Sequence, residues 1–211
     1  MKRVIYIFAV LALFTGVMSL SSCVKRDDYN TTPGGYNHVF NDDFNNNYNG
    51  WAFTDGPNNA YADVYNGLYK LSFSATGSGT YSSTIPTGAN FNYDFLVQTR
   101  IKSDNAMGLV FGASSNTYGY SFFIDDRGYF AVYNEGSNSS GAATLLDWQY
   151  SNAIRTGWND IEIEQRGYYW IGYINNTKVF EIQSQPIYGS KCGYMVLSNT
   201  VGYADYLTIR W

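Results

Sequence analysis

Three carboxylates alternate with two isoleucines in the segment 160–164. Alternate residues of a β-strand point to the same side, so the isoleucines would face a core and the acids would share the opposite face. Two neighbouring carboxyl groups can serve as general acid and as nucleophile in the hydrolysis of a glycosidic bond. The candidate catalytic residues are therefore Asp160, Glu162 and Glu164.

The same acids have a structural interpretation. Asp160 and Glu164 lie about 13 Å apart by strand rise alone, whereas retaining glycosidases hold their two carboxyl groups about 5 Å apart. Arg166 and Lys178 follow in the sequence and could pair with the acids on a solvent-facing strand. An open cleft with two close carboxyl groups would indicate catalysis, and acids paired with Lys or Arg on a flat face would not. We favour the second interpretation.

Aromatic side chains offer a different chemistry, the binding of a sugar. The chain has 21 Tyr among 211 residues, more aromatic surface than its core needs. An exposed ring can stack on the apolar face of a sugar while hydroxyls, carboxylates and amides fix its orientation. If Ile161 and Ile163 face the core, alternation directs four tyrosines outward, and we expect them on one sheet with a tryptophan at the rim. These candidate ligand-binding residues are Tyr129, Tyr133, Tyr169, Tyr173 and Trp148.

Tyrosine is also simply favoured in half-exposed strands, where its rings form cross-strand pairs. A shift of the register by one residue would exchange the two faces of a strand. Both alternatives stay open for each ring taken singly.

Short strands must position all of these side chains. We expect an antiparallel meander of three strands, at 158–166, 167–174 and 177–182. Tight reversals can join them, because Arg166-Gly167 and Asn175-Asn176 tolerate the positive φ that such turns need. Closely spaced strands separated by Gly, Asn or Asp predict two stacked antiparallel sheets and an all-β class. The other expected strands are 39–44, 61–64, 68–74, 81–85, 93–102, 107–113, 118–125, 129–135, 144–148, 193–198 and 206–211.

The meander also carries a resemblance to known families. Its Gly-Trp-Asn opening, its strand ending in Arg166-Gly167 and the run 173–179 resemble the concanavalin A-like lectin/glucanase and laminin-G-like sandwiches. The resemblance extends loosely over 40–211 and implies a two-sheet jelly roll, a fold shared by lectins, adhesion modules and glycosidases. Family 16 glycoside hydrolases carry Glu-x-Asp-x-Glu on one strand. Residues 160–164 match that spacing with the first two acids exchanged.

A structural calcium ion is a further implication of the resemblance. In such sandwiches the first and last strands lie side by side, which would bring Asp43 near Asp205, and hard oxygen ligands suit calcium. The run 43–50 is rich in Asn but lacks the Gly and Glu positions of an EF-hand loop. A calcium site and a plain Asx-rich turn are the two interpretations. We expect no other cofactor.

The N-terminus predicts a lipid anchor. Residues 1–22 have the basic start and short apolar run of a secretory signal peptide. Leu20-Ser21-Ser22-Cys23 resembles the bacterial lipobox, which implies acylation of Cys23, although an uncleaved anchor is the alternative. Residues 25–28 resemble the surface-export signals of Bacteroidetes lipoproteins or form a charged tether. We therefore expect a signal peptide at 1–22, a lipidated cysteine and flexible tether at 23–38, and a β-sandwich at 39–211.

Composition excludes several functions. Loss of Lys2 and Arg3 with the signal peptide makes the formal charge of −4 more negative, which argues against a nucleic-acid partner. His38 is the only histidine, so sites built from several histidines are excluded. With Cys23 acylated, Cys192 has no partner for a disulfide. The sequence thus predicts a lipid-anchored lectin-like domain at the outer membrane or cell surface of a Gram-negative bacterium. A protein-binding or structural surface module is the alternative, and a family 16 glycosidase is third.

Overall fold

The computed structural model describes residues 35–211 except residue 117 and residues 137–140. The predicted signal peptide, Cys23 and most of the tether lie outside these residues. The described part consists of strands and turns, with no helix long and apolar enough to cross a membrane. The predicted all-β class is therefore confirmed.

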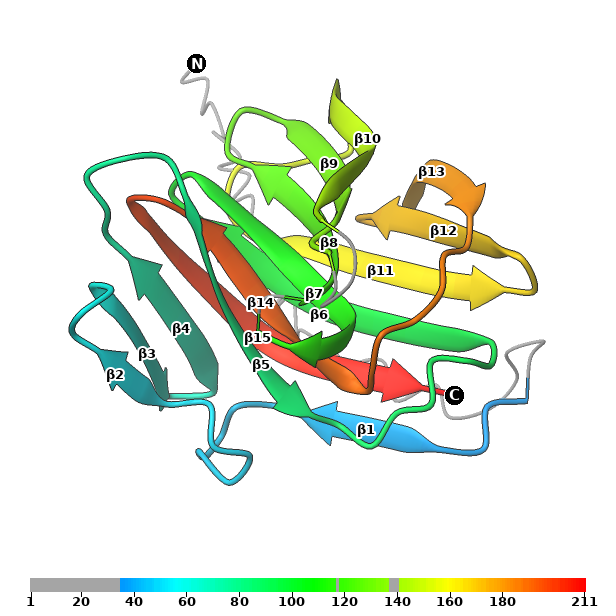
Figure 1. Cartoon of the computed structure of the whole chain (residues 1–211), viewed down its shortest axis with the longest axis horizontal. Helices are drawn as coiled ribbons and strands as arrows, with labels where there is room; N and C mark the ends of the chain where they lie inside the picture. The colour runs from blue at the N-terminus through cyan, green and yellow to red at the C-terminus, as the bar shows by residue number, and fades with distance from the viewer. Residues whose placement is uncertain (1–34, 117, 137–140) are drawn as a thin grey trace, which may run out of the picture. The chain divides into compact units, whose positions relative to one another are not determined.

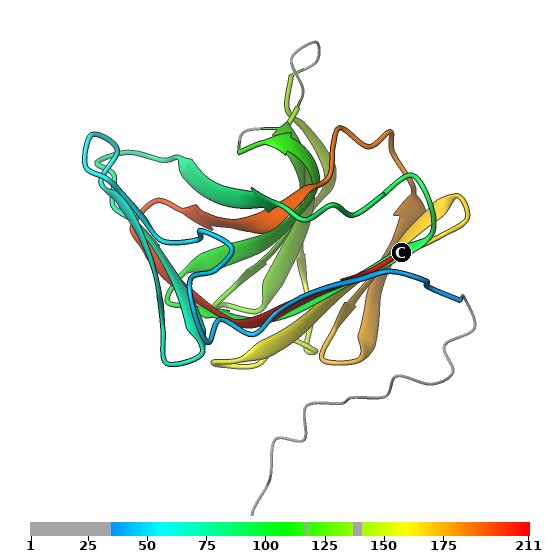
Figure 2. The same cartoon turned by 90° about the horizontal axis from the view of Figure 1, so that it is seen from below.

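Two antiparallel sheets stack on each other, as the edge-on view in Figure 2 shows. The nine-stranded sheet has the order β13 (Thr177–Gln183), β12 (Tyr169–Ile174), β11 (Asn159–Arg166), β6 (Phe95–Ser103), β15 (Thr200–Arg210), β4 (Leu68–Phe73), β3 (Ala60–Tyr65) and β2 (Phe53–Asp55), and β1 (Val39–Asp42) also pairs with β15. The six-stranded sheet has the order β10 (Ala143–Tyr150), β9 (Tyr129–Asn134), β8 (Tyr118–Asp125), β7 (Ala106–Ser115), β14 (Lys191–Leu197) and β5 (Thr80–Pro86).

The predicted meander is confirmed by the antiparallel neighbours β11, β12 and β13 (Figure 1). Gly167 has a φ of 59°, and Asn175 and Asn176 have φ values of 49° and 66°. These left-handed conformations are what the two tight reversals need, because Gly and Asn adopt them at low cost. The expectation that the first and last strands pair is also confirmed, since Asp42 lies opposite Leu207.

The last strand begins earlier than predicted. β15 starts at Thr200, whereas the Gly-containing stretch before 206 was expected to be a loop. Gly202 lies within this strand. A larger residue would not fit at this position, because an added Cβ would lie 2.5 Å from the sulfur of Met107. Close packing between the sheets, and not a turn, explains this glycine.

The core between the sheets is unusually aromatic. Trp51, Tyr69 and Tyr194 are fully buried around Phe44, with ring centroids 5.1–6.3 Å apart. Such tilted and edge-on contacts contribute about 0.5–1.5 kcal/mol beyond area burial. This cluster joins the segment after β1 to both sheets.

Asp42 holds that cluster in place. Its carboxylate is 8% exposed and accepts hydrogen bonds from Phe44 N at 2.9 Å, Asn49 Nδ2 at 2.7 Å and Trp51 Nε1 at 2.8 Å. A buried carboxylate needs such donors because desolvation otherwise makes its charge costly. Asp42 thereby determines the path of the chain from β1 into the core.

Replacing Asp42 by Ala should lower the free energy of unfolding by about 1–3 kcal/mol, because two buried donors and the half-buried amide of Asn49 lose their acceptor. Asp43→Ala is the matched control, since the Asp43 side chain hydrogen-bonds to Asn45 near the surface and should cost under about 1 kcal/mol. Urea denaturation of both variants measures the difference. An equal decrease in the free energy of unfolding of the two variants would contradict the anchoring role of Asp42.

Candidate functional site

The three candidate catalytic acids lie on the outer face of the nine-stranded sheet. Ile161 and Ile163 are buried in the core, so the alternation predicted for β11 is confirmed. The side chains on the opposite face of β11 therefore point away from the core; they are Asp160, Glu162 and Glu164. In the sheet, β11 lies between β6 and β12.

Each of these acids has a partner. Glu164 binds Arg166 Nη2 through both carboxylate oxygens, at 2.7 and 3.0 Å. Asp160 Oδ1 lies 3.8 Å from Arg100 Nε, and Glu162 accepts a hydrogen bond from Gln98 at 2.7 Å. The expected pairing with a cation is found for Glu164 and Asp160. Glu162 is held by an amide instead, and Lys178 pairs with Glu181 and not with any of the three acids.

Electrostatics around Glu162 follow from its burial. Burial raises the pKa of Glu162 and the charge of Glu164 reinforces the shift, while Gln98 and Arg210 oppose it. Tyr36 shares this environment, because burial and then Glu164, Asp94 and Glu162 raise its pKa to about 12, with Arg166 acting in the opposite direction. The segment before β1 therefore lies beside these acids.

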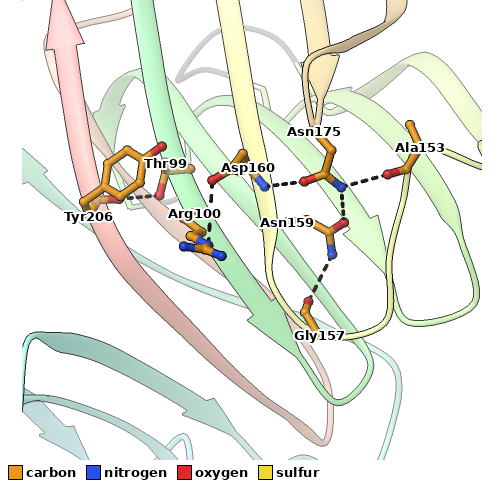
Figure 3. A network of polar contacts seen from close by, with 8 residues as sticks. All are labelled: Thr99, Arg100, Ala153, Gly157, Asn159, Asp160, Asn175 and Tyr206. Atoms are coloured by element: carbon orange, nitrogen blue, oxygen red, sulfur yellow. Dashed lines mark hydrogen bonds and ion pairs between the residues drawn. The ribbon is translucent and has the colours of Figure 1, made fainter. Parts of the chain in front are cut away.

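A network of amides fixes the start of β11 (Figure 3). Asn175 Oδ1 accepts from Asp160 N at 3.0 Å, and Asn175 Nδ2 donates to Ala153 O and Asn159 Oδ1, both at 2.7 Å. Asn159 in turn donates to Gly157 O at 3.0 Å. The backbone at Asp160 is thus held by the turn between β12 and β13, which accounts for the Asn-rich reversal.

A second apolar cluster lies on the outer face of the six-stranded sheet, separate from the core. Phe123 of β8 is 2% exposed and alternates with Phe122, which faces the core. Met195 and Val110 alternate with core residues in the same way on β14 and β7. The sheet is therefore apolar on both faces.

Two of the predicted ligand-binding rings cover this outer cluster. Tyr133 and Trp148 are half-buried, and both ring centroids lie 6.2 Å from that of Phe123. Because both rings rest on a packed apolar base, their orientation is restricted before any ligand arrives. We call Tyr133, Trp148 and Phe123 the aromatic platform.

Two carboxylates flank the platform. Burial raises the pKa of Tyr133, and the charges of Asp147 and Glu135 add to this shift. A hydrogen bond with Trp148 acts in the opposite direction and lowers the pKa. Glu135 itself is largely desolvated, which raises its pKa despite a hydrogen bond from the buried Ser121 hydroxyl. The platform therefore combines apolar ring surface with strong hydrogen-bond acceptors.

The five predicted ligand-binding rings do not lie on one sheet. Tyr129, 39% exposed, shares strand β9 with Tyr133 and packs edge-on against Tyr150. Tyr169 and Tyr173 belong to β12 of the nine-stranded sheet and face away from its core. The expectation of a single surface was wrong because β9 and β12, although similar in pattern, belong to different layers.

Sequence reasoning missed Phe123 and Glu135. The run Ser121 to Ile124 is buried throughout, so it lacks the alternation that marks a one-sided strand. That continuous apolar run was the available signal for a strand covered on both faces. Glu135 follows β9 directly and carried no pattern of its own.

The two candidate calcium ligands lie near the paired first and last strands. Asp43 accepts hydrogen bonds from Asn45, and Asp205 lies at the irregularity of β15 between Ala204 and Tyr206. Among residues 35–211, without 117 and 137–140, no group of three or more His, Cys, Asp or Glu side chains could hold a metal. Calcium binding stays a prediction.

The sequence matches no family model and no curated protein. Several solved structures are similar to it. The GH16 protein of the Bacteroides ovatus mixed linkage glucan PUL, solved with a product, is 10% identical, with 81% of this chain and 99% of that chain covered and a TM-score of 0.50.

Two carbohydrate-binding modules are also similar. CBM66 from Bacillus subtilis is 14% identical over 68% of this chain and 82% of that chain, with a TM-score of 0.47. The CBM2 module of the evolved Dit of Lactobacillus casei BL23 phage J-1 is 17% identical over 87% and 93%, with a TM-score of 0.48. At such identities the likeness concerns the fold, and the chain folds as a two-sheet antiparallel jelly roll of the concanavalin A-like type.

Proposed function

We propose that this domain binds a glycan through the outer face of its six-stranded sheet. The observation that carries the proposal is the aromatic platform, where Tyr133 and Trp148 rest on Phe123 outside the core. A core does not require these residues, since the space between the sheets is already filled by a separate cluster.

The chemistry of the platform suits a sugar. The ring faces of Tyr133 and Trp148 can cover the apolar C–H face of a pyranose, and rigid rings lose little conformational entropy on binding. Glu135 and Asp147, which both act on the Tyr133 hydroxyl, can accept hydrogen bonds from sugar hydroxyls. The GH16 protein of Bacteroides ovatus, a solved structure of similar fold, is in complex with a G4G4G3G product, and we infer a ligand of the same class for this domain.

Desolvation of Glu135 adds to the argument. A carboxylate held where burial disfavours its charge lowers stability, and proteins tend to retain such residues for function. Ser121 is its hydrogen-bond donor, and a ligand hydroxyl would supply another. Binding would therefore relieve part of the desolvation.

Hydrolysis by residues 160–164 has less support. The acids lie on the nine-stranded sheet with partners of their own, away from the platform strands β8 to β10. The alternative function of the platform is binding of a surface protein, and screening for a glycan ligand distinguishes these two functions.

We also propose that Cys23 carries the lipid that holds the domain at the outer membrane or cell surface. The support is the sequence alone, namely the lipobox-like Leu20-Ser21-Ser22-Cys23 and the charged residues that follow. Several acyl chains on one residue anchor a domain firmly, because each buried methylene contributes about 0.8 kcal/mol.

Screening on a glycan array tests the platform. Wild type should bind a defined glycan class, and Trp148→Ala and Tyr133→Ala should each weaken that binding by roughly tenfold through the loss of a stacked ring. Tyr169→Ala and Tyr173→Ala are the controls on the other sheet and should bind as wild type does. Loss of binding only in these controls would move the site to the nine-stranded sheet. If wild type binds no glycan on the array, the glycan proposal fails and a protein partner for the platform becomes the better hypothesis.

Glu135→Gln should raise the thermal midpoint at pH 8 while weakening glycan binding. Because the pKa of Glu135 is raised in the folded domain, the residue contributes stability below its unfolded pKa, and that contribution is lost as the pH rises through the folded pKa. The advantage of the variant should therefore shrink toward pH 4.

Thermal denaturation from pH 4 to pH 8 measures this difference. Glu181→Gln is the matched control, since that exposed acid pairs with Lys178 at the surface and its replacement should change stability by less than about 1 kcal/mol. A Glu135→Gln variant less stable than wild type at pH 8 would show that the charged form is well solvated.

Cys23→Ser should abolish labelling by radioactive palmitate in cells, while the full-length wild-type chain is labelled. Protease treatment of intact cells should remove the wild-type domain if it lies on the surface, and should spare it if it lies in the periplasm. Equal palmitate labelling of both proteins would refute lipidation at Cys23.

A further inference from the structure

A groove of about 660 Å³ lies where the two ends of the described chain meet. Its volume falls within the roughly 300–1,000 Å³ typical of ligand sites. One wall is formed by residues 35–38 with Trp211, and the other by the loop 90–94. The groove uses none of the platform residues.

The first wall is held by the pairing of both chain ends. Asn37 N and His38 N donate to Trp211 O at 3.0 and 3.1 Å, and Trp211 N donates to His38 O at 3.2 Å. The rings of His38 and Trp211 stack with their centroids 5.4 Å apart. This wall therefore presents an aromatic pair on a fixed backbone.

Tyr93 on the opposite wall is exposed yet well supported. Its side chain is 67% exposed, while its carbonyl accepts a hydrogen bond from Gln165 Nε2 at 3.1 Å. Gln165 is fixed in turn by Trp170, whose Nε1 donates to Gln165 Oε1 at 2.8 Å. Next to Tyr93, Asp94 accepts from Gly167 N at 2.8 Å. In the described part of the chain no other aromatic ring packs on that of Tyr93.

The remaining lining consists mainly of amides. Asn37, Asn90 and Asn92 line the groove, and Asn90 Oδ1 accepts from Asn92 at 3.2 Å, which orients both side chains. Among the described residues that line the groove, Asp94 is the one acidic residue and none is a Lys or Arg. Aromatic rings with amide donors and acceptors match a hydroxyl-rich neutral ligand, and the negative charge disfavours an anion.

We propose that this groove is a second glycan site, which takes a neutral sugar unit between Tyr93 and Trp211. The proposal rests on the same ligand class as the proposed function but on different residues. A smaller groove of about 400 Å³, lined by residues 88–92 and 187–190, shares Asn90 and Asn92 with the first.

Titration of the full chain with soluble neutral polysaccharides (glucans, mannans and xylans) tests the groove, with polygalacturonate as the acidic comparison. Tyr93→Ala should weaken binding of the neutral ligand roughly three- to tenfold, and Tyr93→Phe should retain it, because stacking needs the ring and not the hydroxyl. Tyr48→Ala is the matched control, since Tyr48 is 92% exposed and outside both sites. Thermal midpoints confirm folding of each variant.

The outcomes separate the two proposals. Weakening by both Tyr93→Ala and Trp148→Ala supports two sites. If Tyr93→Ala binds the polymer as tightly as wild type does, the groove proposal is overturned and the platform proposal stands. If Tyr93→Ala weakens binding and Trp148→Ala does not, the groove proposal stands and the platform proposal is overturned. Tighter binding of polygalacturonate than of any neutral polymer overturns the groove proposal, and so does failure of wild type to bind any neutral polymer.

Discussion

Burial of apolar side chains on both faces of the six-stranded sheet is the constraint on which the rest of this structure depends. Phe122 fills the space between the sheets, and Phe123, one residue later, needs a cover on the other side. Tyr133 and Trp148 supply that cover. Both rings stay half-buried on the outside of the sandwich, where packing on Phe123 fixes their orientation.

Sequence patterns predicted one-sided strands well. In β11 the isoleucines and acids separate cleanly, and the turns at Gly167 and Asn175 have the positive φ that their residue types indicated. Patterns failed where a strand is buried on both faces, as in β8, because alternation then disappears. They also could not assign β9 and β12 to different layers, since periodicity describes a strand and not its neighbours in space.

The acidic residues divide into two groups by their surroundings. Asp160 and Glu164 lie beside Arg100 and Arg166, at 3.8 and 2.7 Å, and these pairs account for both acids without any ligand. Glu135 lies in a partly desolvated position, where the Ser121 hydroxyl donates a hydrogen bond to it. Glu162, which the spacing along the chain did single out, shares with Glu135 a pKa that burial raises, whereas no pattern in the sequence pointed to Glu135. Only three-dimensional packing distinguishes the two groups.

The stacking of His38 on Trp211 places the entry and exit of the sandwich at one corner. A short peptide could therefore connect them, and a circularly permuted chain with new ends in another turn would keep every strand pairing.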